Sequence, residues 1–297
     1  MPLCWRARVA GNEMGGKALD TTTIQDYYEE SHIDYQLIWQ LPVSHGLHAG
    51  YHDDDHTSHG AAVENMNRVL AETVDIGPDD RVLDCGCGVG GSSVWVADER
   101  GATVQGIDLV PMQLRKARRL AEKRGVADRT AFALADFTNT PFPDDSFDVL
   151  WGIEAICHAE DKTDFVEEAA RLLDDGGRLV LSDGFRTVEN MTPYERESMD
   201  KWLDGWAVPN LATADDFRAA LDDAGFGNVR FEDATENVMP SSKRLYWVSR
   251  LGAPLAKLML KAGVRTPTQE ANRVAARYQH ETLSAGLWQY GIFAAER

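Results

Sequence analysis

The segment Val82-Leu83-Asp84-Cys85-Gly86-Cys87-Gly88-Val89-Gly90-Gly91 constrains the fold more than any other part of the chain. Apolar residues typical of a buried strand run directly into glycines, and a helical pattern begins at Ser92. Glycines let a backbone turn tightly and approach a ligand, and the start of the next helix offers free N–H groups. The segment therefore predicts a strand, a ligand-binding turn and a helix.

Two acidic residues narrow the kind of ligand. Gly86, Gly88 and Gly91 satisfy the G-x-G-x-x-G pattern, so a nicotinamide-dependent oxidoreductase is one alternative. However, Asp84 stands where a carboxylate would repel a pyrophosphate but would suit an ammonium group. Asp108, at the end of the next expected strand, is placed to accept hydrogen bonds from ribose hydroxyls.

Short apolar strands alternate with helical patterns after residue 60. The expected strands are 81–84, 103–108, 130–135, 147–151, 178–183, 229–233 and 288–294, and the expected core helices include 61–74, 92–100 and 111–124. This alternation predicts an α/β fold with a Rossmann-like, doubly wound, mostly parallel seven-stranded sheet. A helical cap or lid is expected over the edge of the sheet where ligands bind.

The expected organisation divides the chain into core and cap segments. These are a flexible N-terminal tail (1–22), an N-terminal lid (23–60), the core (61–186), a cap insertion (187–212), more core (213–238), a helical cap insertion (239–285) and a last core strand (286–297). Because proline disrupts helix interiors, Pro254 is expected to divide its segment into two short helices.

Five motifs in order resemble those of the class I S-adenosylmethionine-dependent methyltransferases. They are Asp84-x-Gly86-x-Gly88-x-Gly90, Asp108, Ala135-Asp136-Phe137, 141–149 and 174–179, where Asp175 replaces the usual proline. The resemblance covers residues 61–186 and resumes at 224–226 and 290–293. It implies S-adenosylmethionine as cofactor and S-adenosylhomocysteine as product. The cofactor-binding residues so predicted are Asp84, Gly86, Gly88, Gly90, Asp108, Leu109, Gln113, Asp136, Phe137, Trp151 and Glu154.

The flanking segments are similar to a narrower group of small-molecule methyltransferases. Tyr27-Tyr28-Glu29-Glu30, Trp39 and 46–51 resemble the N-terminal region of sterol and tocopherol methyltransferases. The segment 154–159 is similar to the matching part of sterol C-methyltransferases. Related enzymes methylate glycine-derived betaines at nitrogen or sugars at oxygen, so the resemblance leaves the methylated atom open.

Glu154 and His158 are the expected catalytic pair. They are four residues apart, so one helical turn would place them on the same face. We expect His158 to act as a general base, with Glu154 tuning it or binding the methionine amine. Tyr28 is expected to close over the sulfonium through a cation–π contact. The predicted substrate-binding residues are Tyr27, Trp39, His48 and Tyr51.

A histidine-rich stretch raises the alternative of a metal site. His45, His48, His52, His56 and His59 lie near Asp53, Asp54 and Asp55. Because methyl transfer from a sulfonium needs no Lewis acid, no metal is expected. Cys85 and Cys87 have no second cysteine pair to complete a zinc site.

The composition is strongly acidic, with a formal net charge of −18. Such a charge disfavours nucleic-acid binding. The chain has 29 Asp and 19 Glu but only 8 Lys. A surface rich in aspartate and poor in lysine is favoured in a cytosol at molar salt, where screening removes the repulsion between carboxylates, so a haloarchaeal origin is expected. The N-terminus lacks the apolar stretch of a secretory signal, which favours a cytoplasmic protein.

Residues 241–265 carry a positive charge, opposite to that of the whole chain. They include six lysines and arginines, no acidic residue, and apolar residues at helical spacing. One interpretation is peripheral contact with anionic lipid, and the other is a cap helix whose basic face meets the acidic core. The favoured acceptor is therefore a small molecule, a prenylated lipid or quinone methylated at carbon. The alternatives are N- or O-methylation of a polar osmolyte-type metabolite and a non-catalytic S-adenosylmethionine-binding protein.

The acidic composition predicts that folding depends on salt. The protein should lose structure in dilute buffer and regain it in molar potassium chloride, because the Debye length shrinks to about 3 Å at 1 M and screens the carboxylates. Circular dichroism across a potassium chloride series tests this, and a melting temperature that does not change with salt contradicts it.

Overall fold

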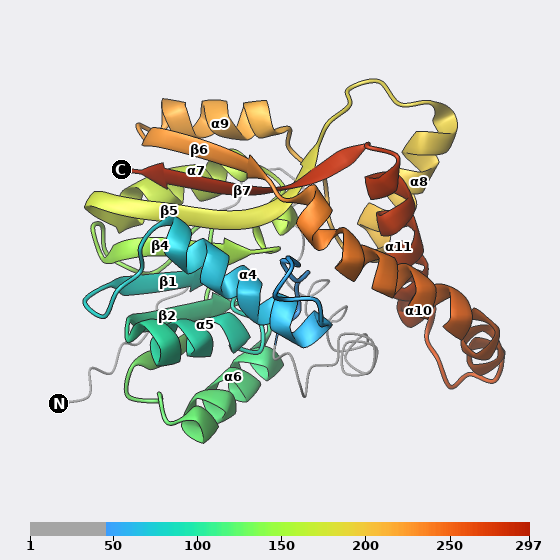
Figure 1. Ribbon diagram of the computed structural model, residues 1–297, viewed down its shortest axis with the longest axis horizontal. Coiled ribbons are helices and arrows are strands. Elements are labelled where there is room, and N and C mark those ends of the chain that lie inside the picture. Colours follow the sequence, from blue (N-terminus) through green and yellow to red (C-terminus); the bar gives the residue numbers. More distant parts are fainter. Residues whose placement is uncertain (1–45) are drawn as a thin grey trace.

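The computed structural model describes residues 46–297, which are built around a seven-stranded sheet (Figure 1). The strand order is β3-β2-β1-β4-β5-β7-β6, and only the two pairs made by β7 are antiparallel. The strands are β1 (Arg81–Cys85), β2 (Thr103–Asp108), β3 (Thr130–Leu134), β4 (Phe147–Ile153), β5 (Leu173–Arg186), β6 (Gly227–Asp233) and β7 (Trp288–Glu296). The predicted Rossmann-like, mostly parallel sheet is confirmed.

The described helices are α4 (His59–Thr73), α5 (Gly91–Trp95), α6 (Pro111–Arg124), α7 (Lys162–Leu172), α8 (Pro193–Gly205), α9 (Ala214–Asp223), α10 (Thr235–Lys261) and α11 (Pro267–Ser284), with a π-helical turn η1 (Val96–Arg100) and a 3₁₀ turn η2 (Ile156–His158). The helix expected over 92–100 is thus α5 followed by η1. Within residues 46–297, no helix has both the length and the apolar character needed to cross a membrane.

The prediction that Pro254 divides its segment was wrong. Helix α10 continues through both Pro240 and Pro254. A proline removes one hydrogen bond to the carbonyl four residues earlier, here that of Arg250. Both Pro254 and Arg250 are exposed, so water can satisfy the freed carbonyl and the helix continues.

Both faces of the central strands β1 and β4 are buried, and side chains that alternate along each strand pack into opposite layers. Val82 belongs to the core formed with α4, α5 and α6, whereas its neighbour Leu83 belongs to the core formed with α7 and α9. Two hydrophobic layers therefore fix the strands, and ligands must bind at an edge of the sheet rather than on a face.

The chain leaves β1 and β4 in opposite directions along the sheet, since β2 lies beyond β1 and β5 lies beyond β4. At such a switch point the connecting loops separate and open a crevice at the carboxyl ends of the strands. Helices α8, α10 and α11 lie beyond this edge (Figure 1). The topology thus places a crevice beneath a helical layer.

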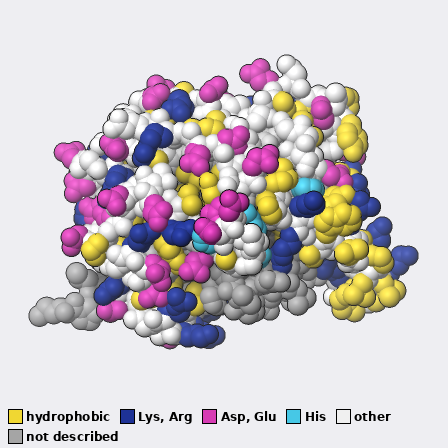
Figure 2. Space-filling model, in the orientation of Figure 1, with side chains coloured by type: hydrophobic (Ala, Val, Ile, Leu, Met, Phe, Trp, Pro, Cys, Tyr) yellow, Lys and Arg dark blue, Asp and Glu magenta, His cyan; other side chains and the backbone are white. Residues whose placement is uncertain are grey.

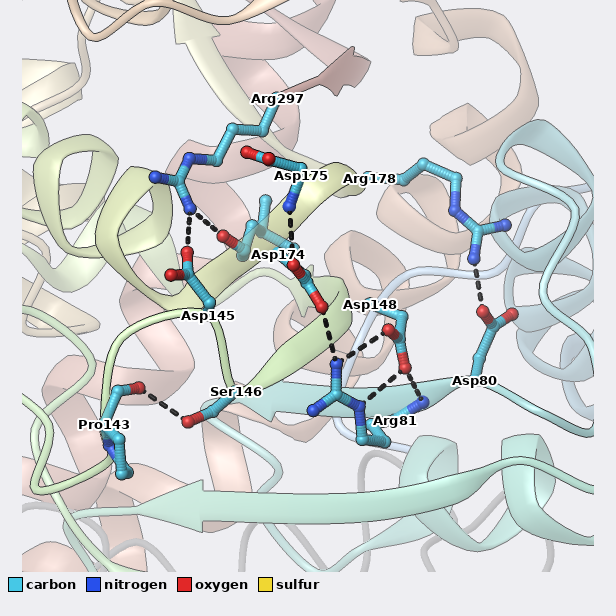
Figure 3. Close-up of polar contacts among 11 residues, drawn as sticks. Asp80, Arg81, Pro143, Asp145, Ser146, Asp148, Asp174, Asp175, Arg178 and Arg297 are labelled. Atoms are coloured by element: carbon cyan, nitrogen blue, oxygen red, sulfur yellow. Dashed lines mark hydrogen bonds and ion pairs between the residues drawn. The ribbon is translucent and has the colours of Figure 1, made fainter.

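The opposite edge of the sheet is held by ion pairs (Figure 3). Arg81 Nη2 lies 2.9 Å from Asp148 Oδ1, joining the starts of β1 and β4. Arg178, in β5, pairs with Asp80, and Arg297 Nη1 lies 2.6 Å from Asp145 Oδ1. Because these contacts lie at the amino ends of the parallel strands, they stabilise the sheet without entering the crevice.

Arg178→Met should lower the free energy of unfolding by about 1–3 kcal/mol, because Arg178 bonds the Asp80 carboxylate and two backbone carbonyls. Arg124→Met is the matched control: its ion pair with Asp98 is more exposed and should contribute about 0–1 kcal/mol. Denaturant titration measures both variants, and equal losses would contradict the assignment.

Candidate functional site

A cavity of about 870 Å³, including space that opens to solvent, lies at the carboxyl ends of β1 and β2. Its walls come from the glycine turn after β1, the ends of the neighbouring strands and residues 46–48. Of the residues predicted to bind the cofactor, it is lined by Asp84, Gly86, Gly88, Asp108, Leu109, Gln113, Phe137 and Glu154. We call it the cofactor cavity.

The glycine turn is fixed by its contacts with the next strand. The backbone N–H groups of Gly86 and Cys87 both donate to the carbonyl of Ile107 at 2.9 Å. Gly86 has a φ of 81°, and a Cβ there would lie 2.5 Å from the Cβ of Ala155. Only glycine therefore allows the turn to pass this close to the loop after β4.

Two carboxylates, of buried Asp84 and half-buried Asp108, line the cofactor cavity. Asp108 Oδ2 accepts from the Gly88 N–H at 2.9 Å, and Oδ1 accepts from the Val110 N–H at 2.8 Å. Burial raises the pKa of Asp108 to about 6 and that of Asp84 to about 7, although Asp84 accepts from Ser93 Oγ at 2.5 Å. A cationic ligand would favour the ionised form of both acids.

His48 lines the cofactor cavity, although the sequence predicted a role in substrate binding. Its Nδ1 donates to the carbonyl of Ala49 at 2.9 Å, and burial lowers the pKa of His48 to about 4. Nε2 of the neutral ring is buried and has no hydrogen-bond partner among the described residues. The acceptors of this wall are therefore the carboxylates of Asp84 and Asp108, which fit the ammonium and ribose hydroxyls of S-adenosylmethionine.

A second cavity, of about 860 Å³ including open space, lies between the sheet and helices α8, α10 and α11. We call it the acceptor cavity. Its apolar lining consists of Leu47, Ala49, Trp202, Trp206, Val208, Leu211, Val238, Leu245 and Trp288. Trp202 and Trp288 stack with ring centroids 4.3 Å apart. Among the described residues, no lysine or arginine lines this cavity.

Leu47, Glu154 and His158 line both cavities and mark their junction. In-line methyl transfer requires the methyl donor and the acceptor to meet in one alignment. Two adjoining cavities with shared walls satisfy this requirement. The structure thus brings together the two residues that the sequence predicted as a catalytic pair.

Glu154 joins the N-terminal segment to the sheet. It follows β4 with a φ of 49°, a conformation that is strained for a glutamate. Its Oε1 accepts from the Ala49 N–H at 2.7 Å and from the Tyr290 hydroxyl at 3.0 Å. Burial raises the pKa of Glu154 to about 7. The side chain therefore ties residues 46–51 and β7 to the junction.

The backbone carbonyl of Ala207 orients the ring of His158. Its Nδ1 donates to the carbonyl of Ala207 at 3.1 Å, so Nε2 is the acceptor of the neutral ring. Burial lowers the pKa of His158, and the nearby Asp183 carboxylate opposes this shift. Ala207 itself has a φ of 55°. The ring is therefore neutral near pH 7 and able to take a proton.

Asp183, which the sequence analysis missed, lies in the acceptor cavity beside His158. Its Oδ2 accepts from the Cys157 N–H and its Oδ1 from the Gly184 N–H, both at 2.8 Å. Burial raises the pKa of Asp183, and these donors oppose the shift. The available signal was position, because Asp183 ended a predicted strand, as Asp108 did.

Four predicted site residues line neither cavity. Trp151 is buried in β4 opposite Asp84, and Gly90 packs against α6. Asp136 Oδ1 accepts from Thr138, and the Tyr51 hydroxyl donates to Glu232 at 3.2 Å. The remaining predicted residues, Tyr27, Tyr28 and Trp39, lie outside the described residues.

The histidine-rich segment makes local contacts. Asp53 Oδ1 lies 2.7 Å from His56 Nδ1, and His52 Nε2 lies 3.1 Å from Ser241 Oγ. Within residues 46–297, no group of three or more histidine, cysteine, aspartate or glutamate side chains is arranged to hold a metal ion.

Residues 83–181 match the family described as "Methyltransferase domain". The 27-O-demethylrifamycin SV methyltransferase of Amycolatopsis mediterranei is 34% identical over 66% of this chain and 71% of its own length. The 2-methyl-6-phytyl-1,4-hydroquinone methyltransferase of Synechocystis is 33% identical over 74% of this chain and 69% of its own. The probable tocopherol O-methyltransferase of rice is 30% identical over 73% of this chain, and the match spans 63% of the rice protein.

Solved structures share the fold at low identity. The [4+2]-cyclase SpnF gives a TM-score of 0.77 with 19% identity, covering 93% of this chain and 96% of its own. Geranyl diphosphate C-methyltransferase from Streptomyces coelicolor, in complex with S-adenosylhomocysteine, gives a TM-score of 0.72 with 18% identity, covering 96% of this chain and 100% of its own. Because a cyclase shares the architecture, it is the sequence relatives that show the family.

Affinity for S-adenosylmethionine should fall as the pH is lowered from about 8 to 6. Asp84 and Asp108 have pKa values of about 7 and 6 without ligand, so acid protonates the carboxylates that would bind the ammonium and accept from the ribose hydroxyls. Binding near pH 6.5 should therefore release protons. Calorimetry in buffers of different ionisation enthalpy measures both effects.

Asp84→Asn should weaken this binding by about 1.5–3 kcal/mol at pH 8, the range for hydrogen bonds to charged groups, and reduce its pH dependence. Asp128→Asn, an exposed surface acid, is the matched control and should behave like the parent. An unchanged pH profile in both Asp84→Asn and Asp108→Asn would refute the role of these acids.

These findings argue against the alternative of a nicotinamide-dependent oxidoreductase. The matched domain and the named relatives identify a methyltransferase, and the acceptor-rich cofactor cavity suits S-adenosylmethionine. The chain belongs to the class I S-adenosylmethionine-dependent methyltransferases that act on small molecules.

Proposed function

We propose that this enzyme methylates a small, largely apolar acceptor that carries an ionisable ring hydroxyl, of the prenylated phenol or quinol class, and that the methyl group goes to carbon. The observation that carries the proposal is the junction at which Glu154 and His158 separate an acceptor-rich cofactor cavity from an aromatic-walled cavity. Related proteins named for tocopherol and phytyl hydroquinone support this acceptor class.

The lining of the acceptor cavity distinguishes between acceptor classes. Stacked Trp202 and Trp288 offer flat apolar surface to a ring or an isoprenoid chain. Asp183 and Glu154 contribute carboxylates, whereas no cation lines the cavity among the described residues. A carboxylate-bearing osmolyte precursor would find no counter-ion there. The geometry therefore supports the apolar acceptor over the polar alternative.

His158 supplies the base for this chemistry. Its Nε2 takes the hydroxyl proton of the acceptor, because Nδ1 is engaged by the Ala207 carbonyl. Asp183 stabilises the imidazolium that forms, through its negative charge. In this proposal Asp183 is a positioning and electrostatic residue and does not touch the methyl group.

Deprotonation makes the ring carbon beside the oxygen nucleophilic. That carbon bonds to the methyl carbon as the methyl–sulfur bond of S-adenosylmethionine breaks. The ring carbon then loses its hydrogen as a proton to solvent, and the ring oxygen regains the proton held by His158, which restores the aromatic hydroxyl and the neutral imidazole. Each turnover therefore releases one net proton. The cavity walls supply alignment and exclude water from the junction.

We also propose that the acceptor is lipid-like and reaches the enzyme from a membrane surface, which extends the proposal to peripheral membrane association. An amphipathic acceptor of this class concentrates in bilayers. Helix α10 provides four residues of the acceptor cavity, Val238, Ser241, Ser242 and Leu245, and its other end is the basic segment identified in the sequence.

His158→Ala should lower turnover at saturating cofactor by about 10²-fold or more, as for the loss of a general base, while affinity for S-adenosylmethionine changes little. Asp183→Asn should lower turnover less, because the base remains. His56→Ala is the matched control, since His56 lines neither cavity. Equal turnover of His158→Ala and the parent would make His158 a bystander.

The acceptor class is tested by incubating the enzyme with methyl-labelled cofactor and either a lipid extract or a polar extract of cells. Label should enter a compound of the lipid extract that carries a phenolic hydroxyl. Label only in amines or carboxylates of the polar extract would overturn the acceptor class and leave the methyltransferase assignment in place.

A further inference from the structure

We propose that the C-terminal half of α10 is a docking surface for a bilayer that contains anionic lipid. The inference extends the proposed lipid-like acceptor by naming the surface at which the enzyme meets it. We call this the α10 face: the apolar residues Trp247, Val248, Leu251, Leu255 and Leu258 with the cations Lys243, Arg250, Lys257 and Lys261.

The apolar side chains of the α10 face are unusually exposed. Leu251, Leu255 and Leu258 are 76%, 63% and 64% exposed, and Trp247 is 49% exposed. Contiguous apolar exposure of this kind marks an interaction site in soluble proteins, because burying it elsewhere would be favourable. A cap helix that packs through its apolar side would bury these leucines against the core, whereas in the structure they are exposed.

The spacing of its residues gives α10 an exposed apolar side, a buried side and a basic flank. Trp247, Leu251, Leu255 and Leu258 recur at three- and four-residue intervals and so share one side of the helix. Leu245, Ser249 and Ala256 are buried and form the opposite side, which packs on the rest of the molecule. The outward side is thus the apolar one.

The cations follow one flank of this apolar stripe. Arg250, Lys257 and Lys261 recur at seven- and four-residue intervals, and all three are exposed. Helix α10 contains no acidic residue after Glu236. In Figure 2 hydrophobic and basic side chains gather where the end of α10 projects in Figure 1, whereas acidic side chains are spread over the sheet-bearing part of the same view.

This combination specifies the occupant. Leucines beside lysines fit the boundary between acyl chains and anionic headgroups, and tryptophan favours such interfaces. A second copy docked through its own α10 face would bury leucine against leucine but would bring the lysines and arginines of the two copies together. A second copy docked through its acidic surface would leave the leucines against charged groups. The bilayer satisfies both components at once.

Docking through the α10 face would also bring the acceptor cavity near the bilayer. The same helix contributes Val238, Ser241 and Leu245 to the cavity wall and the exposed leucines to the surface. An amphipathic acceptor would then pass from the lipid to the cavity along one helix.

The test is flotation of the full-length protein with vesicles of phosphatidylcholine alone or mixed with phosphatidylglycerol, at about 0.1 M and 1 M potassium chloride. The parent should float with the mixed vesicles. Lys257→Glu/Lys261→Glu should weaken binding at least tenfold at low salt and much less at high salt, because screening shortens electrostatic reach. Leu255→Glu/Leu258→Glu should weaken it at least tenfold at both salts.

Lys123→Glu/Arg124→Glu on α6 is the matched charge control, and Leu134→Glu, an exposed leucine at the end of β3, is the apolar control. Both should bind as the parent does. Circular dichroism and S-adenosylmethionine affinity verify that each variant is folded.

The docking surface would be overturned if the parent failed to float at both salt concentrations, or if the α10 variants lost no more binding than the control variants. A dimer that Leu255→Glu/Leu258→Glu abolishes, without vesicle binding, would assign the face to a second copy. Because flotation needs no acceptor, its failure leaves the chemistry at His158 intact, and failure of the His158 test leaves flotation unaffected.

Discussion

The hydrogen bonds that converge on Glu154 Oε1 attach the N-terminal segment to the sheet. The Ala49 N–H and the Tyr290 hydroxyl both donate to this oxygen, so the N-terminal segment and the last strand meet at the end of β4. Leu47 and His48 then become walls of the cofactor cavity. A half-buried carboxylate that accepts from two donors is costly to leave unpaired, and this contact fixes the position of the segment. The junction between the cavities depends on this contact.

Desolvated acids give the site its chemical character. Asp84, Asp108, Glu154 and Asp183 all lie near the carboxyl ends of parallel strands, and burial raises the pKa of each. Such a site is unfavourable for its own ionised groups and correspondingly favourable for a cation that compensates them. On the outside of the molecule the α10 face carries positive charge, whereas the chain as a whole is strongly acidic.

The sequence predicted the strands well because each combines an apolar run with a glycine or acidic boundary. The observed β2 and α6 have the predicted bounds, and Asp84, Asp108 and Gln113 do line one cavity. Predictions that depended on distant contacts were less successful. Asp183 was missed because its neighbour His158 is 25 positions away, and Trp151 was placed in the site although β4 turns it into the core. Pro254 was expected to end a helix because sequence does not reveal which carbonyl is exposed to water.

The sequence by itself determined the methyltransferase core, because glycine conformations, strand periodicity and strand-end acids are local properties that short segments encode. Only the tertiary structure decided which residues face each other across the two cavities. The pairing of His158 with Ala207 and Asp183, the tie between Glu154 and Tyr290, and the outward direction of the α10 leucines arise from packing between elements far apart in the chain. These are long-range contacts, and a single sequence carries no record of them.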